Sequence, residues 1–122
     1  MRIVVGGQIE KDHLAKQLDA AFRQHSVVAQ ISQKSDIEAA MAVKSGEADY
    51  YFGACNTGGG GALAMAIALL GADQCATIGM PGKLLSDDEI AAQVRAGKKA
   101  FGFTGQDIDK VVPTLVRLII NE

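Results

Sequence analysis

The residues with the clearest chemical potential lie in the stretch "CNTGGGG", which runs from Cys55 to Gly61. Glycine loses more conformational freedom on ordering than any other residue, so four in a row need a reason. Backbone N–H groups at a helix start, aided by the helix dipole, bind anions, and glycine lets an anion approach the backbone. The stretch therefore predicts a strand-to-helix turn that binds an anionic group. The ligand-binding residues expected in this turn are Asn56, Gly58, Gly59 and Gly60.

Cys55 and Thr57 are the candidate catalytic residues of this turn. A thiol at a helix N-terminus can have a lowered pKa, which would make Cys55 a base or a nucleophile. Thr57 would cap the helix or contact a ligand through its hydroxyl. The alternative is structural: cysteine is a common small buried residue, and glycines after a strand also permit close packing of a helix on a sheet. Cys75 is expected in the core.

Short apolar runs alternate with segments of helical period along the whole chain. The predicted strands are residues 2–7, 27–31, 49–54, 74–79 and 100–103. This alternation predicts one α/β domain over residues 1–122, a doubly wound, five-stranded parallel sheet with helices on both faces, Rossmann-like or flavodoxin-like. The flavodoxin-like strand order 2-1-3-4-5 is expected. Residue patterns support the helices: Leu14 and Leu18 share one stripe, and Ser86 opens a capping box with Glu89. Pro113 predicts a kink or a restart in the last helix.

Such sheets bind ligands at the carboxyl ends of their strands, where the strand order reverses. With the expected order, this point lies between the first and third strands. Three further elements then reach the same edge as the glycine turn. The ligand-binding residues expected from them are Gly6, Gly7 and Gln8 after the first strand, Lys83 after the fourth and Thr104 after the fifth. Lys83 would supply a full positive charge to an anionic ligand.

Composition excludes several classes of function. The net charge is −2 and only 5% of residues are aromatic, so a basic platform that binds nucleic acid is not expected. The apolar part of the uncharged run at residues 50–72 covers only 62–70, which is shorter than the roughly 20 residues of a membrane span. The first residues do not form a signal peptide, and a cytoplasmic location is expected. Two distant cysteines and two isolated histidines give no zinc or disulfide pattern, so no metal or cofactor is expected.

The segments "AMAVKSGEADYYFGACNTGGGGALAMAIALLG", "TIGMPGK" and "AFGFT" resemble the small bacterial YhfU-type proteins, which are related to the glycine-rich SFCGS proteins. The resemblance covers nearly the whole chain, and the turn with Cys55 is its most specific part. Members of this group tend to be encoded beside enzymes of sugar and amino-acid metabolism. The resemblance therefore implies a metabolic setting without naming a reaction.

A more distant resemblance is to ribose-5-phosphate isomerase B and the galactose-6-phosphate isomerase subunits. Those proteins carry a Cys-Gly-Thr-Gly-x-Gly turn after a strand, and the residues that match it here are Cys55, Thr57, Gly58 and Gly60. The resemblance implies that Cys55 shuttles a proton between sugar carbons and that Thr57 assists ring opening. Backbone amides near Gly58 and Gly60 would then hold the enediolate as its charge develops.

This chain departs from the isomerase pattern at three places. Gln8-Ile9 replaces the Asp-His that follows the first strand, Asn56 replaces a glycine, and the phosphate-binding arginines have no clear match. The hypothesis is therefore a protein that binds a small anionic metabolite, such as a phosphorylated sugar or sugar acid, with isomerase-type chemistry through Cys55. The alternative is a non-catalytic docking subunit whose helix at 62–70 packs on a second copy or on a partner metabolic enzyme. Either way, a homo-oligomer is expected.

Overall fold

A parallel sheet of five strands forms the centre of the computed structural model, which describes residues 1–121. The spatial order is β2-β1-β3-β7-β4, and every neighbouring pair is parallel. The strands are β1 (Arg2–Gly7), β2 (Gln30–Gln33), β3 (Tyr50–Cys55), β4 (Cys75–Thr77) and β7 (Ala100–Thr104). The predicted α/β class with a five-stranded parallel sheet is therefore confirmed.

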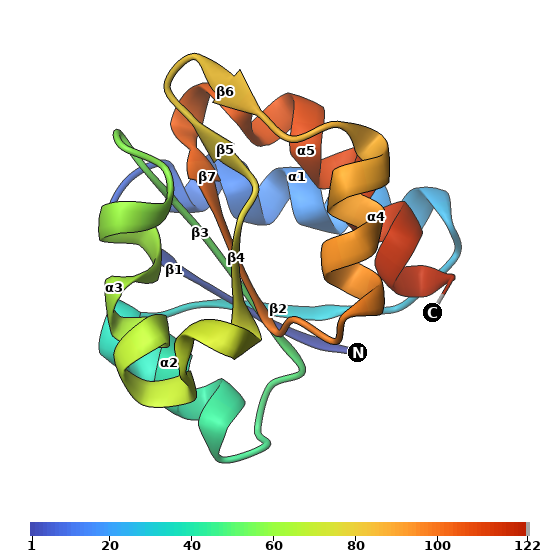
Figure 1. Ribbon diagram of the computed structural model, residues 1–122. Coiled ribbons are helices and arrows are strands. Elements are labelled where there is room, and N and C mark those ends of the chain that lie inside the picture. Colours follow the sequence, from blue (N-terminus) through green and yellow to red (C-terminus); the bar gives the residue numbers. More distant parts are fainter. Residues whose placement is uncertain (122) are drawn as a thin grey trace.

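Helices cover both faces of the sheet (Figure 1). On one face lie α1 (Lys11–Gln24), α4 (Asp87–Arg95) and α5 (Ile108–Ile120). On the other face lie α2 (Asp36–Lys44) and α3 (Gly59–Leu70), which pack against each other. Two short 3-10 turns, Ala72–Gln74 and Gly105–Asp107, complete the described helical segments. Helix α5 runs through Pro113 without a restart.

The expected strand order is wrong at its last two positions. β7 lies between β3 and β4, so the fifth strand in sequence is the fourth in space. All five residues of β7 are buried, which requires neighbours on both edges, whereas β4 has only three residues and suits the sheet edge. The strand predicted at 74–79 is also wrong in extent. Its last part forms β5 (Gly79–Met80), which pairs antiparallel with β6 (Lys83–Leu84) in a small hairpin.

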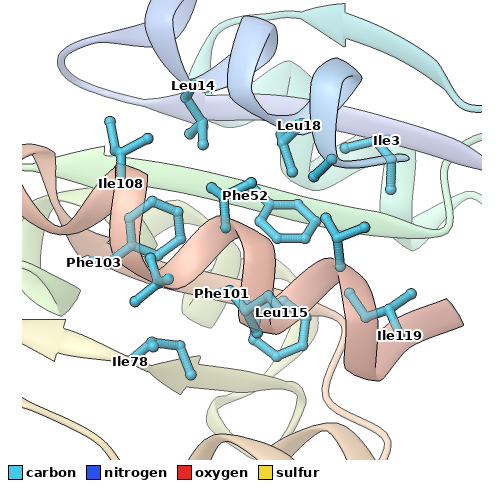
Figure 2. Packing of buried hydrophobic residues seen from close by; sticks show 14 of the residues in the cluster. Ile3, Leu14, Leu18, Phe52, Ile78, Phe101, Phe103, Ile108, Leu115 and Ile119 are labelled. Carbon is cyan, nitrogen blue, oxygen red and sulfur yellow. The ribbon is translucent and has the colours of Figure 1, made fainter. Parts of the chain in front are cut away.

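The two faces of the sheet have cores of different character. Under α1 and α5 the core is bulky, with Phe52, Phe101 and Phe103 packed below the helices (Figure 2). Under α2 and α3 it is built largely from alanines, together with Tyr51 and Leu63. A Cβ on Gly102 would lie only 2.6 Å from Leu63 Cγ, so this glycine gives α3 its close approach to the sheet. Close packing brings the start of α3 against the ends of the central strands.

Serines cap the starts of α2 and α4, whereas the N-cap residue of α3 is Gly58 and not Thr57. Ser86 and Glu89 form a complete capping box at the start of α4, as predicted. At the start of α2, Ser35 Oγ accepts the Glu38 N–H at 3.2 Å. Across residues 1–121, no helix is both long enough and apolar enough to cross a membrane.

Candidate functional site

A cleft of about 560 Å³, called the main cleft below, lies at the carboxyl ends of β1, β3 and β7. The hairpin β5–β6 and the turn from β3 into α3 lie at the same end of the sheet (Figure 1). The lining residues are Ile9, Glu10, Asn56, Pro81, Thr104, Gly105 and Gln106. The cleft adjoins the point between β1 and β3 where the strand order reverses, which is where the sequence places a ligand.

Only part of the predicted ligand-binding set reaches the main cleft. Asn56 and Thr104 line it. Gln8 lines a second cleft, of about 530 Å³, and its side chain covers Gly61, where a Cβ would lie 2.5 Å from Gln8 Oε1. Lys83 is exposed and pairs with Met80 inside the hairpin, outside the lining of the main cleft.

The glycines at the end of β1 serve packing. Both are buried, and a Cβ on Gly6 would lie 2.6 Å from the ring of Tyr51. Gly7 has a φ of +82°, and a Cβ there would lie 2.5 Å from the backbone nitrogen of Ala54. Each position excludes a side chain because a neighbouring strand or ring fills the space. Neither Gly6 nor Gly7 lines the main cleft.

The expected glycine loop is shorter than predicted. Helix α3 begins at Gly59, so only Gly58 of the four glycines lies in the turn, and the helix includes the three others. Gly58 has a φ of +86°, and a Cβ there would collide with the carbonyl oxygen of Gly79 in the hairpin. Gly60 is exposed, with Thr57 Oγ1 3.3 Å from the position of a Cβ. Gly58 therefore joins the turn to the hairpin, while Gly60 leaves the helix start open.

The Cys55 thiol lies within this turn, and its residue is only 1% exposed. Its Sγ donates to the carbonyl oxygen of Gly58 at 3.0 Å and lies 3.4 Å from Thr57 Oγ1. Burial raises the pKa of the thiol. Hydrogen bonds from the Thr57 hydroxyl and from the backbone N–H groups of Thr57, Ala62 and Gly61 outweigh that effect, so the pKa of Cys55 lies below its ordinary value. Backbone N–H groups at the start of α3, which the sequence assigns to a bound anion, thus donate to the sulfur of Cys55.

The second cysteine has the opposite electrostatic environment. Burial raises the pKa of Cys75, which lies in the edge strand β4 as a free thiol. Cys75 therefore belongs to the core, as the sequence indicates. Among the cysteines, only Cys55 has surroundings that stabilise a thiolate.

Three residues near the site were not predicted from the sequence. Tyr51 is fully buried, and its Oη accepts the Gly7 N–H at 3.1 Å and donates to the Ala62 carbonyl at 2.6 Å. Asp107 Oδ2 accepts the hydroxyl of Thr104 at 2.7 Å, and the three-residue spacing of this pair was the available signal. Glu10 lines both clefts.

Residues 1–121 hold no group of three or more His, Cys, Asp or Glu side chains arranged to bind a metal ion. His13 Nε2 lies 2.6 Å from Asp109 Oδ1, on the first turns of α1 and α5. The described residues at this edge of the sheet supply a thiol, hydroxyls, side-chain amides and the carboxylates of Glu10 and Asp107.

Fold and site together define a Rossmann-like α/β protein with a cysteine at a strand-to-helix turn beside a polar cleft. The chain belongs to the family described as "Protein of unknown function DUF2620", whose profile matches residues 1–119. It is 48% identical over 82 residues to "Uncharacterized protein YhfU" of Escherichia coli strain K12, a match that covers 67% of this chain and 70% of the relative. The relative of the same name in Shigella flexneri matches equally well.

Two solved structures of similar fold are sugar isomerases. The ribose 5-phosphate isomerase of Thermotoga maritima matches with a TM-score of 0.62 and 16% identity, over 98% of this chain and 83% of that chain. A 4-deoxy-L-threo-5-hexosulose-uronate ketol-isomerase, solved with tartrate, matches with a TM-score of 0.59 and 13% identity, over 100% of this chain and 64% of that one. At these identities the likeness establishes the fold.

Proposed function

We propose that this protein binds a small sugar-type metabolite with an anionic group and isomerises it by proton transfer through Cys55. The observation that carries the proposal is the set of hydrogen-bond donors near Cys55 Sγ, which lowers the pKa of this thiol, next in sequence to Asn56 in the lining of the main cleft. The sugar isomerases of similar fold support the choice of substrate class. A thiolate near neutral pH is a competent carbon base when the product charge is stabilised.

In the proposed step, the Cys55 thiolate takes the proton from the carbon next to the substrate carbonyl. The electron pair of that C–H bond forms a C=C bond, and the carbonyl oxygen becomes the enediolate oxygen. Backbone N–H groups near Gly58 and Gly60 stabilise this charge as it develops. The thiol then returns its proton to the former carbonyl carbon while a hydroxyl proton moves to the oxygen, which regenerates the thiolate. The net result interconverts an aldose and a ketose.

The reaction requires the turn at Asn56 to move, because Cys55 is buried whereas Asn56 lines the main cleft. Gly58 packs on the backbone of Gly79, so the hairpin β5–β6 holds the turn in its closed position. Substrate binding between Asn56 and Pro81 would separate these two segments and open a path to the sulfur.

The anionic group of the substrate needs a positive partner. Among the described residues, those that line the main cleft include no Lys, Arg or His. The second cleft shares Ile9 and Glu10 with it and contains Lys11 and Lys16. The proposal therefore places the hydroxyl-bearing carbons in the main cleft and the anionic group toward these lysines.

Proton exchange with solvent tests the proposal without knowledge of the product. The protein is incubated in D₂O with phosphorylated pentoses, phosphorylated hexoses and sugar acids. Proton NMR then follows loss of the signal from the carbon next to the carbonyl. We expect exchange with at least one compound for wild type and for the control Cys75→Ser, and none for Cys55→Ser. Exchange that persists in Cys55→Ser, or no exchange with any compound, would overturn the proposal.

A second candidate function is docking between copies of this chain, favoured by apolar side chains on the outer surface of α2 and α3. Ile37, Met41 and Ile67 are 56%, 44% and 42% exposed. Helix α3 carries no charged residue, so two copies related by a two-fold axis would meet there without like-charge repulsion. Light scattering at several concentrations tests this: we expect a dimer for wild type and a monomer for Ile67→Glu. A wild-type monomer at micromolar concentration would exclude it.

A further inference from the structure

Glu10 has an unusual backbone for its place in the fold. It is the N-cap residue of α1, directly after the turn that leaves β1, and its φ of 58° and ψ of 30° are left-handed. Among the described residues, Glu10 and Ser26 are the non-glycine residues with positive φ. Left-handed backbone is unfavourable for an L-residue with a Cβ, so its presence needs a compensating gain.

Helix stability does not explain Glu10. N-cap residues normally have extended backbone, and Ser, Thr, Asp and Asn are preferred because their short side chains accept a helix N–H. Glu10 has neither property, since its side chain makes no capping hydrogen bond. Ser26 differs because it lies just beyond the C-terminus of α1, where left-handed residues commonly end helices. Of these two described residues, only Glu10 therefore has a left-handed backbone that does not serve to begin or end its helix.

The position of Glu10 explains the strain. Its Cγ lies 3.4 Å from the place of a Cβ on Gly105, so the stem of the side chain lies over the end of β7. Glu10 lines both clefts, and it shares the main cleft with Asn56 and Thr104. Within residues 1–121 no hydrogen bond or ion pair engages its carboxylate. The left-handed backbone thus presents an acceptor to a cleft that otherwise offers amides, a hydroxyl and backbone groups.

We infer that the Glu10 carboxylate binds two neighbouring hydroxyl groups of the ligand and so sets the specificity of the main cleft for polyhydroxylated molecules. The inference rests on the proposed function and names the part of the substrate that this cleft recognises. An ionised carboxylate only accepts hydrogen bonds, and its two oxygens match two adjacent O–H donors. Glu10 is a binding residue here, and Cys55 remains the base.

Three variants test the inference, each in the Cys55→Ser background so that binding is measured without turnover. Glu10→Gln keeps the strain and the shape but removes the charge. Glu10→Gly removes both the strain and the side chain. Ser26→Gly removes comparable strain far from the clefts, and Cys55→Ser alone is the reference. Calorimetry measures the Kd for the sugar phosphates and sugar acids named above, and for analogues that lack one hydroxyl.

We expect Glu10→Gln and Glu10→Gly to weaken binding of the full ligand roughly 10- to 100-fold, and binding of one deoxy analogue much less. Glu10→Gly and Ser26→Gly should each raise Tm by roughly 3–6 °C, but only the first should lose affinity. If Glu10→Gln binds every ligand as the reference does, the inference on Glu10 is wrong while the proposed function stands. If the reference binds none of the compounds, the proposed function fails and the inference fails with it. If Glu10→Gly is no more stable than the reference, the strain argument is wrong.

Discussion

The hydroxyl of Tyr51 is the most informative single atom to remove. Tyr51 is fully buried in β3, and its Oη links the end of β1 to the first turn of α3. It accepts the N–H of Gly7 and donates to the carbonyl of Ala62. Tyr51→Phe keeps the ring that fills the space above Gly6 and removes both hydrogen bonds.

The expected loss of stability follows from the two groups left behind. A buried polar group without a partner costs about 1–3 kcal/mol, and the N–H of Gly7 and the carbonyl of Ala62 both lose one. The two groups together would therefore cost about 2–6 kcal/mol. Because the Ala62 carbonyl belongs to a helix and can accept a helical N–H, we expect a cost in the lower half of that range. We expect Tyr51→Phe to lower the free energy of unfolding by about 3 kcal/mol, and Tm by roughly 10 °C.

Urea unfolding followed by circular dichroism measures this change. The slope of the free energy of unfolding against urea concentration should be the same for wild type and Tyr51→Phe, because the folded state keeps its packing. Amide hydrogen exchange adds a local control, because the Gly7 N–H should exchange faster in Tyr51→Phe than in wild type. The exchange rates of amides in α5, on the opposite face, should rise only as far as the overall loss of stability requires. A fall of less than about 1 kcal/mol, or no selective change at Gly7, would refute the reasoning.

The same variant has a second signature at high pH. Burial raises the pKa of Tyr51 above its ordinary value of about 10. Above that value the unfolded chain loses this proton while the folded chain keeps it, so wild type loses stability as pH rises. The loss is about 1.4 kcal/mol per pH unit until the folded pKa is reached. Tyr51→Phe should lack this contribution, so the stability gap between the two proteins should narrow above pH 10.

Two further predictions concern the cysteine turn. Gly58→Ala should lower the free energy of unfolding by at least about 2 kcal/mol, because the φ of +86° is left-handed and the new Cβ would meet the backbone of Gly79. The matched change Gly60→Ala should lower it by less than about 1 kcal/mol in the same urea titration. Equal losses for the two variants would contradict the packing of Gly58 on the hairpin. Thiolate absorbance at 240 nm should show Cys55 ionising below the ordinary thiol pKa and Cys75 above it. Because its pKa is lowered in the folded protein, Cys55 increases the free energy of unfolding at pH values above the ordinary thiol pKa. This contribution is lost as pH falls through the pKa of Cys55 in the folded protein, and Cys55→Ser should lack it at every pH.

Local sequence patterns were sufficient for the class of fold and for the bounds of some strands, whereas the strand predicted at 27–31 lies at Gln30–Gln33. The bounds of β1 match the prediction at residues 2–7, because its apolar run is continuous and ends in two glycines. The order of the strands in the sheet could not be predicted from such local patterns. "AFGFT" and "CATIG" are both short apolar runs, and only the burial of β7 by neighbours far apart in sequence makes it central. The hairpin β5–β6 has strands of two residues each, too short to produce a period.

The candidate site was predictable where it depends on strand ends. Asn56 directly follows β3 and Thr104 is the last residue of β7, and both reach the main cleft because parallel strands end at one edge. Glu10 was not predictable, since nothing in the residue types signals a left-handed N-cap. The packing role of Gly6 also depends on a partner far away in sequence, the ring of Tyr51.

The glycines of this protein connect its packing to its chemistry. Gly53 and Gly102 leave the sheet surface low beneath α3, so that the carbonyl of Ala62 and the side chain of Leu63 occupy the space that side chains would fill. The first turn of α3 can therefore approach β3 closely enough for its N–H groups to reach Cys55 Sγ. A bulkier sheet surface would hold the helix farther away, and burial alone would then raise the pKa of this thiol, as it does at Cys75. The lowered pKa of Cys55 is thus a consequence of small residues placed under a whole helix, not of the four consecutive glycines alone.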